Sequence, residues 1–70
     1  MLVNIEAERV RKQLTKEELA KELGISLKTY YNWISEERDI PSKKLKQISL
    51  LFGVTMDYLV EGASGAKEVV

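Results

Sequence analysis

The 70-residue sequence contains no cysteine and no histidine. Without cysteine, neither a disulfide framework nor a thiolate metal site can form. Without histidine, the chain lacks the commonest general base and metal ligand. No apolar run approaches the length of a membrane span, and charged residues soon follow Met1 to Val3, where a signal peptide would need an apolar core. The sequence therefore predicts a cytoplasmic protein without cofactors, membrane association or an evident small-molecule substrate.

The residues that are present form no recognisable catalytic set. The serine and threonine hydroxyls have no histidine or cysteine to partner them, and no glycine-rich phosphate loop occurs. Glu17 and Glu18 are adjacent, so on a helix their carboxylates would point in different directions. A reaction would need a nucleophile with its base, a metal cluster or a pair of facing carboxylates. We therefore expect that the protein is not an enzyme.

Basic and acidic residues balance over the whole chain, with 11 of each. The balance is uneven along the sequence, however. Residues 1–46 hold ten Lys or Arg and eight Asp or Glu, whereas residues 47–70 hold one Lys and three Asp or Glu. Overall neutrality argues against a polyanionic partner, but the weak positive excess lies in the first two thirds of the chain.

Apolar residues recur at helical spacing, and no strand pattern occurs. The sequence predicts an all-α fold, with one domain over residues 1–61 and a flexible C-terminal tail over residues 62–70. Five helices are expected, at about residues 2–12, 16–23, 27–35, 42–52 and 56–61. The predicted core consists of Ile5, Leu14, Leu19, Ala20, Leu23, Ile25, Tyr30, Trp33, Ile40, Leu45, Ile48, Phe52, Val54 and Leu59.

Residues 14–35 carry the strongest functional signal. Thr15 and Glu18 have the spacing of a capping box, Gly24 is placed to end the second helix, and Ser26 is placed to cap the third. Two amphipathic helices joined this tightly through a glycine form a helix-turn-helix. The two helices would cross at Ala20, so a larger side chain there should overpack the crossing.

The third predicted helix has two different faces. Its inner stripe carries Tyr30, Trp33 and Ile34, and its outer face carries Leu27, Lys28, Tyr31, Asn32 and Ser35. Asparagine can bond adenine through two hydrogen bonds in the major groove, and an apolar side chain can pack on a thymine methyl group. We predict that Leu27, Lys28, Tyr31 and Asn32 read DNA bases. An ordinary solvent-exposed helix face is the alternative.

Several lysines are expected in the first turn of a helix, where the helix dipole disfavours a cation by about 0.3–1 kcal/mol. Backbone N–H groups at a helix start can bind phosphate together with a lysine. The predicted phosphate contacts are Lys16, Ser26, Thr29, Ser35, Arg38, Lys43 and Lys44. Lys28 also lies in the first turn of a predicted helix, and it is expected to contact phosphate as well as to read bases. The alternative is that exposed lysines near helix ends are common and almost neutral for stability.

Five segments together resemble the Cro and lambda-repressor-like, XRE-type helix-turn-helix DNA-binding domain. They are TKEELA (15–20), LGIS (23–26), Asn32-Trp33, Pro41-Ser42 and LFGVTMDYL (51–59), and the resemblance covers residues 4–61. It implies a five-helix repressor-like bundle whose third helix, 27–35, lies in the major groove. It further implies a sequence-specific transcriptional repressor of prokaryotic, phage or mobile-element origin. Such a protein would bind a palindromic double-stranded operator as a homodimer.

The sequence departs from that family at three places. Lys16 stands where family members commonly carry a phosphate-contacting glutamine. Ile34 stands where they commonly carry a glutamate that pairs with an arginine at the position of Arg9. We therefore expect Arg9 to reach another carboxylate or to extend to solvent. The loop 35–39 is acidic where relatives carry basic residues, so we expect modest, salt-sensitive DNA affinity.

The sequence also leaves a second functional class open. The neutral surface could serve a protein partner, as in an antitoxin-like or adaptor module on the same fold. If the protein is a dimer, Met56, Tyr58 and Val60 of the fifth helix are the expected contact surface, on their position alone.

Overall fold

The computed structural model describes residues 1–61, which form five α-helices and no strand. The helices are α1 (Val3–Arg11), α2 (Lys16–Leu23), α3 (Leu27–Ile34), α4 (Ser42–Phe52) and α5 (Met56–Val60). The predicted all-α fold is confirmed, and every predicted helix boundary lies within one residue of the observed one. The tail expected at residues 62–70 lies outside the described residues.

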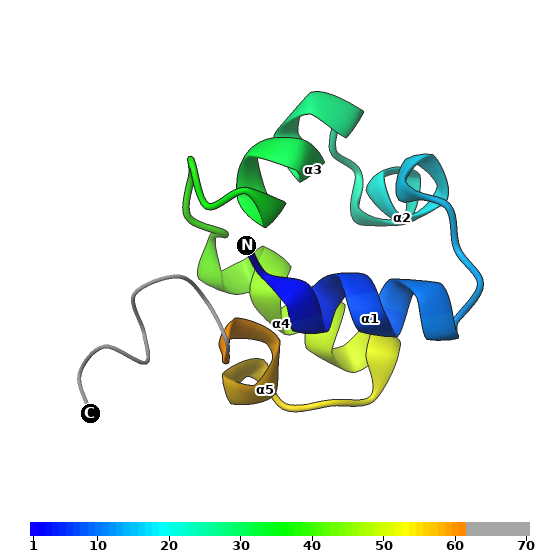
Figure 1. The fold of residues 1–70 in the computed structure, drawn as a ribbon, viewed down its shortest axis with the longest axis vertical. Helices are drawn as coiled ribbons and strands as arrows, with labels where there is room; N and C mark the ends of the chain where they lie inside the picture. The colour runs from blue at the N-terminus through cyan, green and yellow to red at the C-terminus, as the bar shows by residue number, and fades with distance from the viewer. Residues whose placement is uncertain (62–70) are drawn as a thin grey trace.

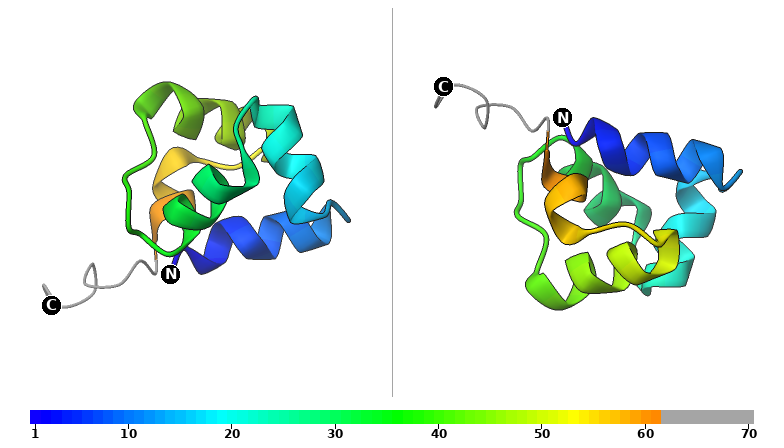
Figure 2. Two further views of the ribbon diagram at one scale, coloured as in Figure 1. Left: turned by 90° about the horizontal axis from the view of Figure 1, so that it is seen from above. Right: turned by 90° about the horizontal axis from the view of Figure 1, so that it is seen from below.

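The helices α2 and α3 form one end of the molecule, and α5 lies at the other end (Figure 1). Between them, α1 packs against both α3 and α5, while α4 packs against α2 and α5. Figure 2 shows the same arrangement from the two ends, with the loop between α3 and α4 running along one side. This frame leaves one face of α3 directed away from the rest of the protein.

The buried core contains most of the predicted residues. Leu14, Ile25, Ile40, Leu45 and Val54 are partly buried and pack against it, together with Tyr58. The buried core also includes Leu2 and Ile34, which the predicted core lacked. Their backbones are joined by a hydrogen bond of 3.0 Å from Leu2 N to Ile34 O. The complete set is Leu2, Ile5, Leu19, Ala20, Leu23, Tyr30, Trp33, Ile34, Ile48, Phe52 and Leu59.

Local hydrogen bonds fix the turn between α2 and α3. Thr15 N donates to Glu18 Oε1 at 2.8 Å and Glu18 N donates to Thr15 Oγ1 at 3.0 Å, which confirms the capping box. Gly24 ends α2 with φ of +69°, a left-handed conformation that favours glycine. Ser26 Oγ accepts from Thr29 N at 3.1 Å and so caps α3. The predicted helix-turn-helix geometry is therefore present.

Candidate nucleic-acid interface

One side of α3 is directed to solvent. Tyr30, Trp33 and Ile34 are buried against the core, whereas Lys28, Tyr31 and Ser35 are exposed and Asn32 is half-buried. Tyr31 leaves 50% of its surface accessible. Steps of 100° per residue place these four outward residues side by side, and α3 contains no acidic residue. Lys28, Tyr31, Asn32 and Ser35 are called the α3 ridge below.

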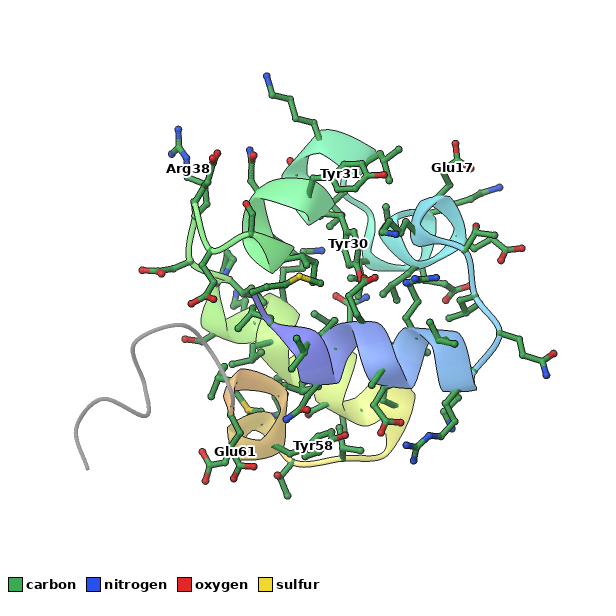
Figure 3. All side chains as sticks on the ribbon, in the orientation of Figure 1. Glu17, Tyr30, Tyr31, Arg38, Tyr58 and Glu61 are labelled. Atoms are coloured by element: carbon green, nitrogen blue, oxygen red, sulfur yellow. The ribbon has the colours of Figure 1, made fainter. Side chains whose placement is uncertain are left out.

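Two surface depressions flank the α3 ridge. The Lys16 depression is lined by Met1, Glu6, Lys16, Tyr31, Ile34 and Ser35. The Arg38 depression is lined by Thr29, Asn32, Trp33, Arg38, Asp39 and Pro41. In Figure 3, Tyr31 lies between Arg38 and Glu17 at the end of the molecule that α2 and α3 form. The ridge therefore projects between two hollows, and each hollow carries one cation that the sequence predicted as a phosphate contact.

The loop after α3 folds back onto the end of that helix. The carbonyl oxygen of Asn32 accepts hydrogen bonds from Glu37 N at 2.9 Å and Arg38 N at 3.2 Å. Glu36 has a left-handed backbone with φ of +68°, and its carboxylate contacts the amino group of Met1. Arg38 is exposed beside Asn32, while Glu36 is directed to the side where the chain begins.

The predicted base-reading residues share one helix, but their exposure differs. Leu27 is half-buried at the start of α3, so less of its side chain can reach a partner than that of Lys28 or Tyr31. Ser26 and Thr29 lie together at the same helix start, where Ser26 Oγ donates to Thr29 Oγ1 at 2.9 Å. Ser26, Thr29 and the α3 ridge thus lie on the outer side of this segment, whereas Tyr30, Trp33 and Ile34 on its inner side are buried.

The four predicted lysine contacts differ in what their ammonium groups already bind. Lys28 and Lys43 are exposed, and within residues 1–61 neither forms an ion pair. Lys44 is half-buried, and its Nζ donates to the carbonyl oxygen of Leu23 at 2.5 Å, at the C-terminal end of α2. Lys16 Nζ lies 3.6 Å from Glu6 Oε1. Two of the four ammonium groups therefore have internal partners.

Glu6 is the centre of a polar cluster beneath the α3 ridge. Arg9 Nε and Nη2 donate to its two oxygens at 3.2 and 3.0 Å, and the Tyr30 hydroxyl also donates to it. Partial burial alone would raise the pKa of Glu6, but these hydrogen bonds and the positive charges of Arg9 and Lys16 lower it overall. Burial and the Glu6 carboxylate raise the pKa of the Tyr30 hydroxyl.

Arg9 therefore finds its carboxylate one turn away on its own helix. Of the two alternatives expected for Arg9, the first is confirmed, because Arg9 binds the carboxylate of Glu6 while Ile34 is buried in the core. Sequence reasoning missed Glu6 itself. The available signal was the spacing of three residues between Glu6 and Arg9, which places oppositely charged side chains next to each other on a helix.

A second polar cluster ties α5 to α1 at the opposite end of the molecule. Glu8 is buried, accepts from the Tyr58 hydroxyl at 3.2 Å and lies 3.5 Å from Arg11 Nη1. Asn4 Nδ2 donates to the Tyr58 carbonyl oxygen at 2.7 Å. Tyr58 is thus bonded within the domain, whereas Val60 leaves 40% of its surface accessible.

Residues 1–61 contain no group of three or more His, Cys, Asp or Glu side chains that could hold a metal ion. None of the five described helices combines the length and the apolar character that crossing a membrane requires.

The sequence of residues 5–59 matches the profile of the Helix-turn-helix family. The chain belongs to this family. The resemblance to XRE-type helix-turn-helix domains is therefore confirmed. The chain is also 34% identical over 64 residues to a Bacillus subtilis (strain 168) protein named "Uncharacterized HTH-type transcriptional regulator YqaE". That match covers 91% of the chain and 55% of the relative, so this helix-turn-helix chain spans about half the length of that protein. No solved structure matches the present chain.

Proposed function

We propose that the protein is a sequence-specific double-stranded DNA-binding transcriptional regulator whose α3 lies in the major groove. One observation carries this proposal. A projecting helix face without acidic residues lies between two depressions, and each depression contains a cation, Lys16 or Arg38. A helix in the major groove has a phosphate backbone on either side of it, so this arrangement places one cation toward each backbone, beside the carboxylates of Glu6 and Asp39 that also line the depressions. Membership of the helix-turn-helix family and the name of the relative support the same function.

In this proposal the predicted contact residues divide into two roles. Leu27, Lys28, Tyr31 and Asn32 read base edges, and the phosphate contacts are Lys16, Ser26, Thr29, Ser35, Arg38, Lys43 and Lys44. The ammonium of Lys28, in the first turn of α3, also neutralises a phosphate. Lys28 and Lys43 contribute most, because their ammonium groups are exposed and have no ion-pair partner within residues 1–61. Lys44 contributes least, since its ammonium already binds the end of α2.

We further propose that the protein acts in the cytoplasm of a prokaryote, or belongs to a phage or mobile element, as a homodimeric repressor on a palindromic operator. A two-fold dimer binds two half-sites about one helical turn apart, and it would block a promoter by occupying it. The exposed Val60 and the half-buried Met56 on α5 support α5 as the contact surface.

Fluorescence anisotropy with duplex DNA across a salt series tests the proposal. A DNA binder should lose affinity linearly on a double-logarithmic plot, with a slope of about −0.9 for each neutralised phosphate. Footprinting on genomic fragments would then report the half-site spacing and so test the dimer. Absence of binding to pooled genomic fragments at low salt would overturn the proposal and favour a protein–protein module on the same fold.

A further inference from the structure

An acidic side chain lies beside the surface that is proposed to approach phosphate. Glu6 lines the Lys16 depression together with Tyr31 and Ser35 of the α3 ridge. Its Oε1 lies 3.6 Å from Lys16 Nζ, and the two side chains leave 15% and 37% of their surfaces accessible. A negative charge at this place opposes the approach of a polyanion, because like charges repel each other when they are closer than the Debye length.

Glu6 cannot easily turn away from Lys16. Arg9 holds both of its carboxylate oxygens, and the Tyr30 hydroxyl holds one of them from the buried side. Bidentate arginine–carboxylate pairs of this kind fix geometry as well as add energy. The carboxylate is therefore a fixed negative charge, shared between Arg9, which is nearly buried, and Lys16, which is open to solvent.

We propose that Glu6 is a determinant of DNA affinity, because it holds the Lys16 ammonium in an internal ion pair and so lowers the contribution of Lys16 to phosphate binding. This inference rests on the proposed DNA-binding function. A phosphate that approaches the start of α2 must share the ammonium with Glu6 or displace it. Both options lower the gain from the new contact, because Glu6 keeps its other hydrogen bonds and stays in place.

A double-mutant cycle with Glu6→Gln and Lys16→Gln tests the inference. Glutamine keeps a carbonyl acceptor for Tyr30 and Arg9 but removes the charge. At about 0.1 M salt, Glu6→Gln should tighten binding to duplex DNA about two- to fivefold, the range expected for loss of a partly exposed ion pair. It should also steepen the salt slope by up to about 0.9, which corresponds to one more neutralised phosphate. Lys16→Gln should weaken binding more in the Glu6→Gln background than in the wild type.

Glu8→Gln is the matched control. It removes the same charge from the same helix, but Glu8 bonds Tyr58, which lies at the far end of the molecule from Tyr31 (Figure 3). The inference requires a clearly smaller gain in affinity for Glu8→Gln than for Glu6→Gln. Equal gains would show an effect of net charge alone, and equal effects of Lys16→Gln in both backgrounds would show that Glu6 does not act through Lys16. Either result overturns the inference.

Two further outcomes are distinguishable. If circular dichroism shows that Glu6→Gln does not fold, Lys16→Gln is compared with Lys28→Gln in the wild-type background. The inference then requires that Lys16→Gln flatten the salt slope less than Lys28→Gln does, and equal flattening overturns it. If the wild type binds DNA and Glu6→Gln binds it with the same affinity and salt slope, the inference is overturned but the proposed function is not. Absence of any salt-dependent binding by the wild type would overturn the proposed function and the inference with it.

Discussion

Lys28 and Lys44 should separate DNA binding from stability when each is replaced by methionine. Both were predicted as phosphate contacts from their place in the first turn of a helix, yet the structure gives their ammonium groups different surroundings. Lys28 is exposed on the α3 ridge, whereas Lys44 Nζ binds the carbonyl oxygen of Leu23 at 2.5 Å. That carbonyl is one of the last in α2, where unpaired acceptors and the helix dipole both favour a cation.

The expected magnitudes follow from these surroundings. Lys28→Met should reduce the magnitude of the salt slope by about 0.9, so that between 50 and 200 mM salt the variant loses about 3.5-fold less affinity than the wild type. Its free energy of unfolding should stay within about 0.5 kcal/mol, as for most surface changes. Lys44→Met should change the salt slope much less than Lys28→Met does, because the Lys44 ammonium already binds the end of α2. It should cost about 1 kcal/mol of stability, because it removes a charge-assisted hydrogen bond from a half-buried site, and this lowers Tm by about 4–8 °C.

Fluorescence anisotropy measures the salt slope, and urea unfolding followed by Trp33 fluorescence and circular dichroism measures stability. Methionine keeps most of the apolar stem of either lysine, so lost packing should contribute little in both variants. If Lys44→Met flattens the salt slope as strongly as Lys28→Met and leaves Tm unchanged, the assignment of Lys44 to the end of α2 is wrong. If Lys28→Met leaves the slope unchanged, the start of α3 does not approach a phosphate.

Three other results are expected. Asn32→Ala should cost about 1–3 kcal/mol on a specific site but little on a scrambled duplex, and equal losses on both would contradict base reading. Ala20→Leu should cost about 1–3 kcal/mol of stability in urea unfolding, because Ala20 is only 3% exposed where α2 meets α3. The control is Ala7→Leu at an exposed position of α1, which should leave the free energy of unfolding almost unchanged. Because the pKa of Glu6 is lowered in the folded state, its contribution to stability is present above its ordinary value of about 4.5 and is lost as the pH falls below it. The urea midpoint should therefore fall less between pH 7 and pH 3 in Glu6→Gln than in the wild type, whereas Glu17→Gln, at an exposed position, should follow the wild type.

Local signals in the sequence were sufficient to predict the helices and the turn. The capping box of Thr15 and Glu18, the glycine at position 24 and the cap at Ser26 each act within one helical turn, so their geometry follows from residue type and spacing. The inner and outer faces of α3 followed from periodicity for the same reason. The two depressions beside the α3 ridge could not be predicted in this way, because residues from separate elements line them.

The charged side chains were harder to predict, because their partners depend on how separate elements pack. Lys44 on α4 binds the end of α2, and Tyr30 on α3 binds Glu6 on α1. Neither contact follows from spacing along the chain. A lysine in the first turn of a helix thus looked the same in the sequence whether its ammonium lies in solvent, as for Lys28, or against a neighbouring helix.

The residue at the end of α3 connects these observations. Ile34 completes the apolar core but leaves no carboxylate for Arg9, whose side chain is only 12% exposed and needs a charged partner. Glu6 supplies that partner from the preceding turn of α1, and Oε1, the oxygen that accepts from Arg9 Nη2, also lies 3.6 Å from Lys16 Nζ at the start of α2. With an apolar residue at position 34, the carboxylate that pairs with Arg9 thus lies at the edge of the proposed DNA surface. The net charge of zero therefore does not describe the charge that a phosphate would meet at this surface, because that charge depends on local pairs such as Glu6 with Lys16.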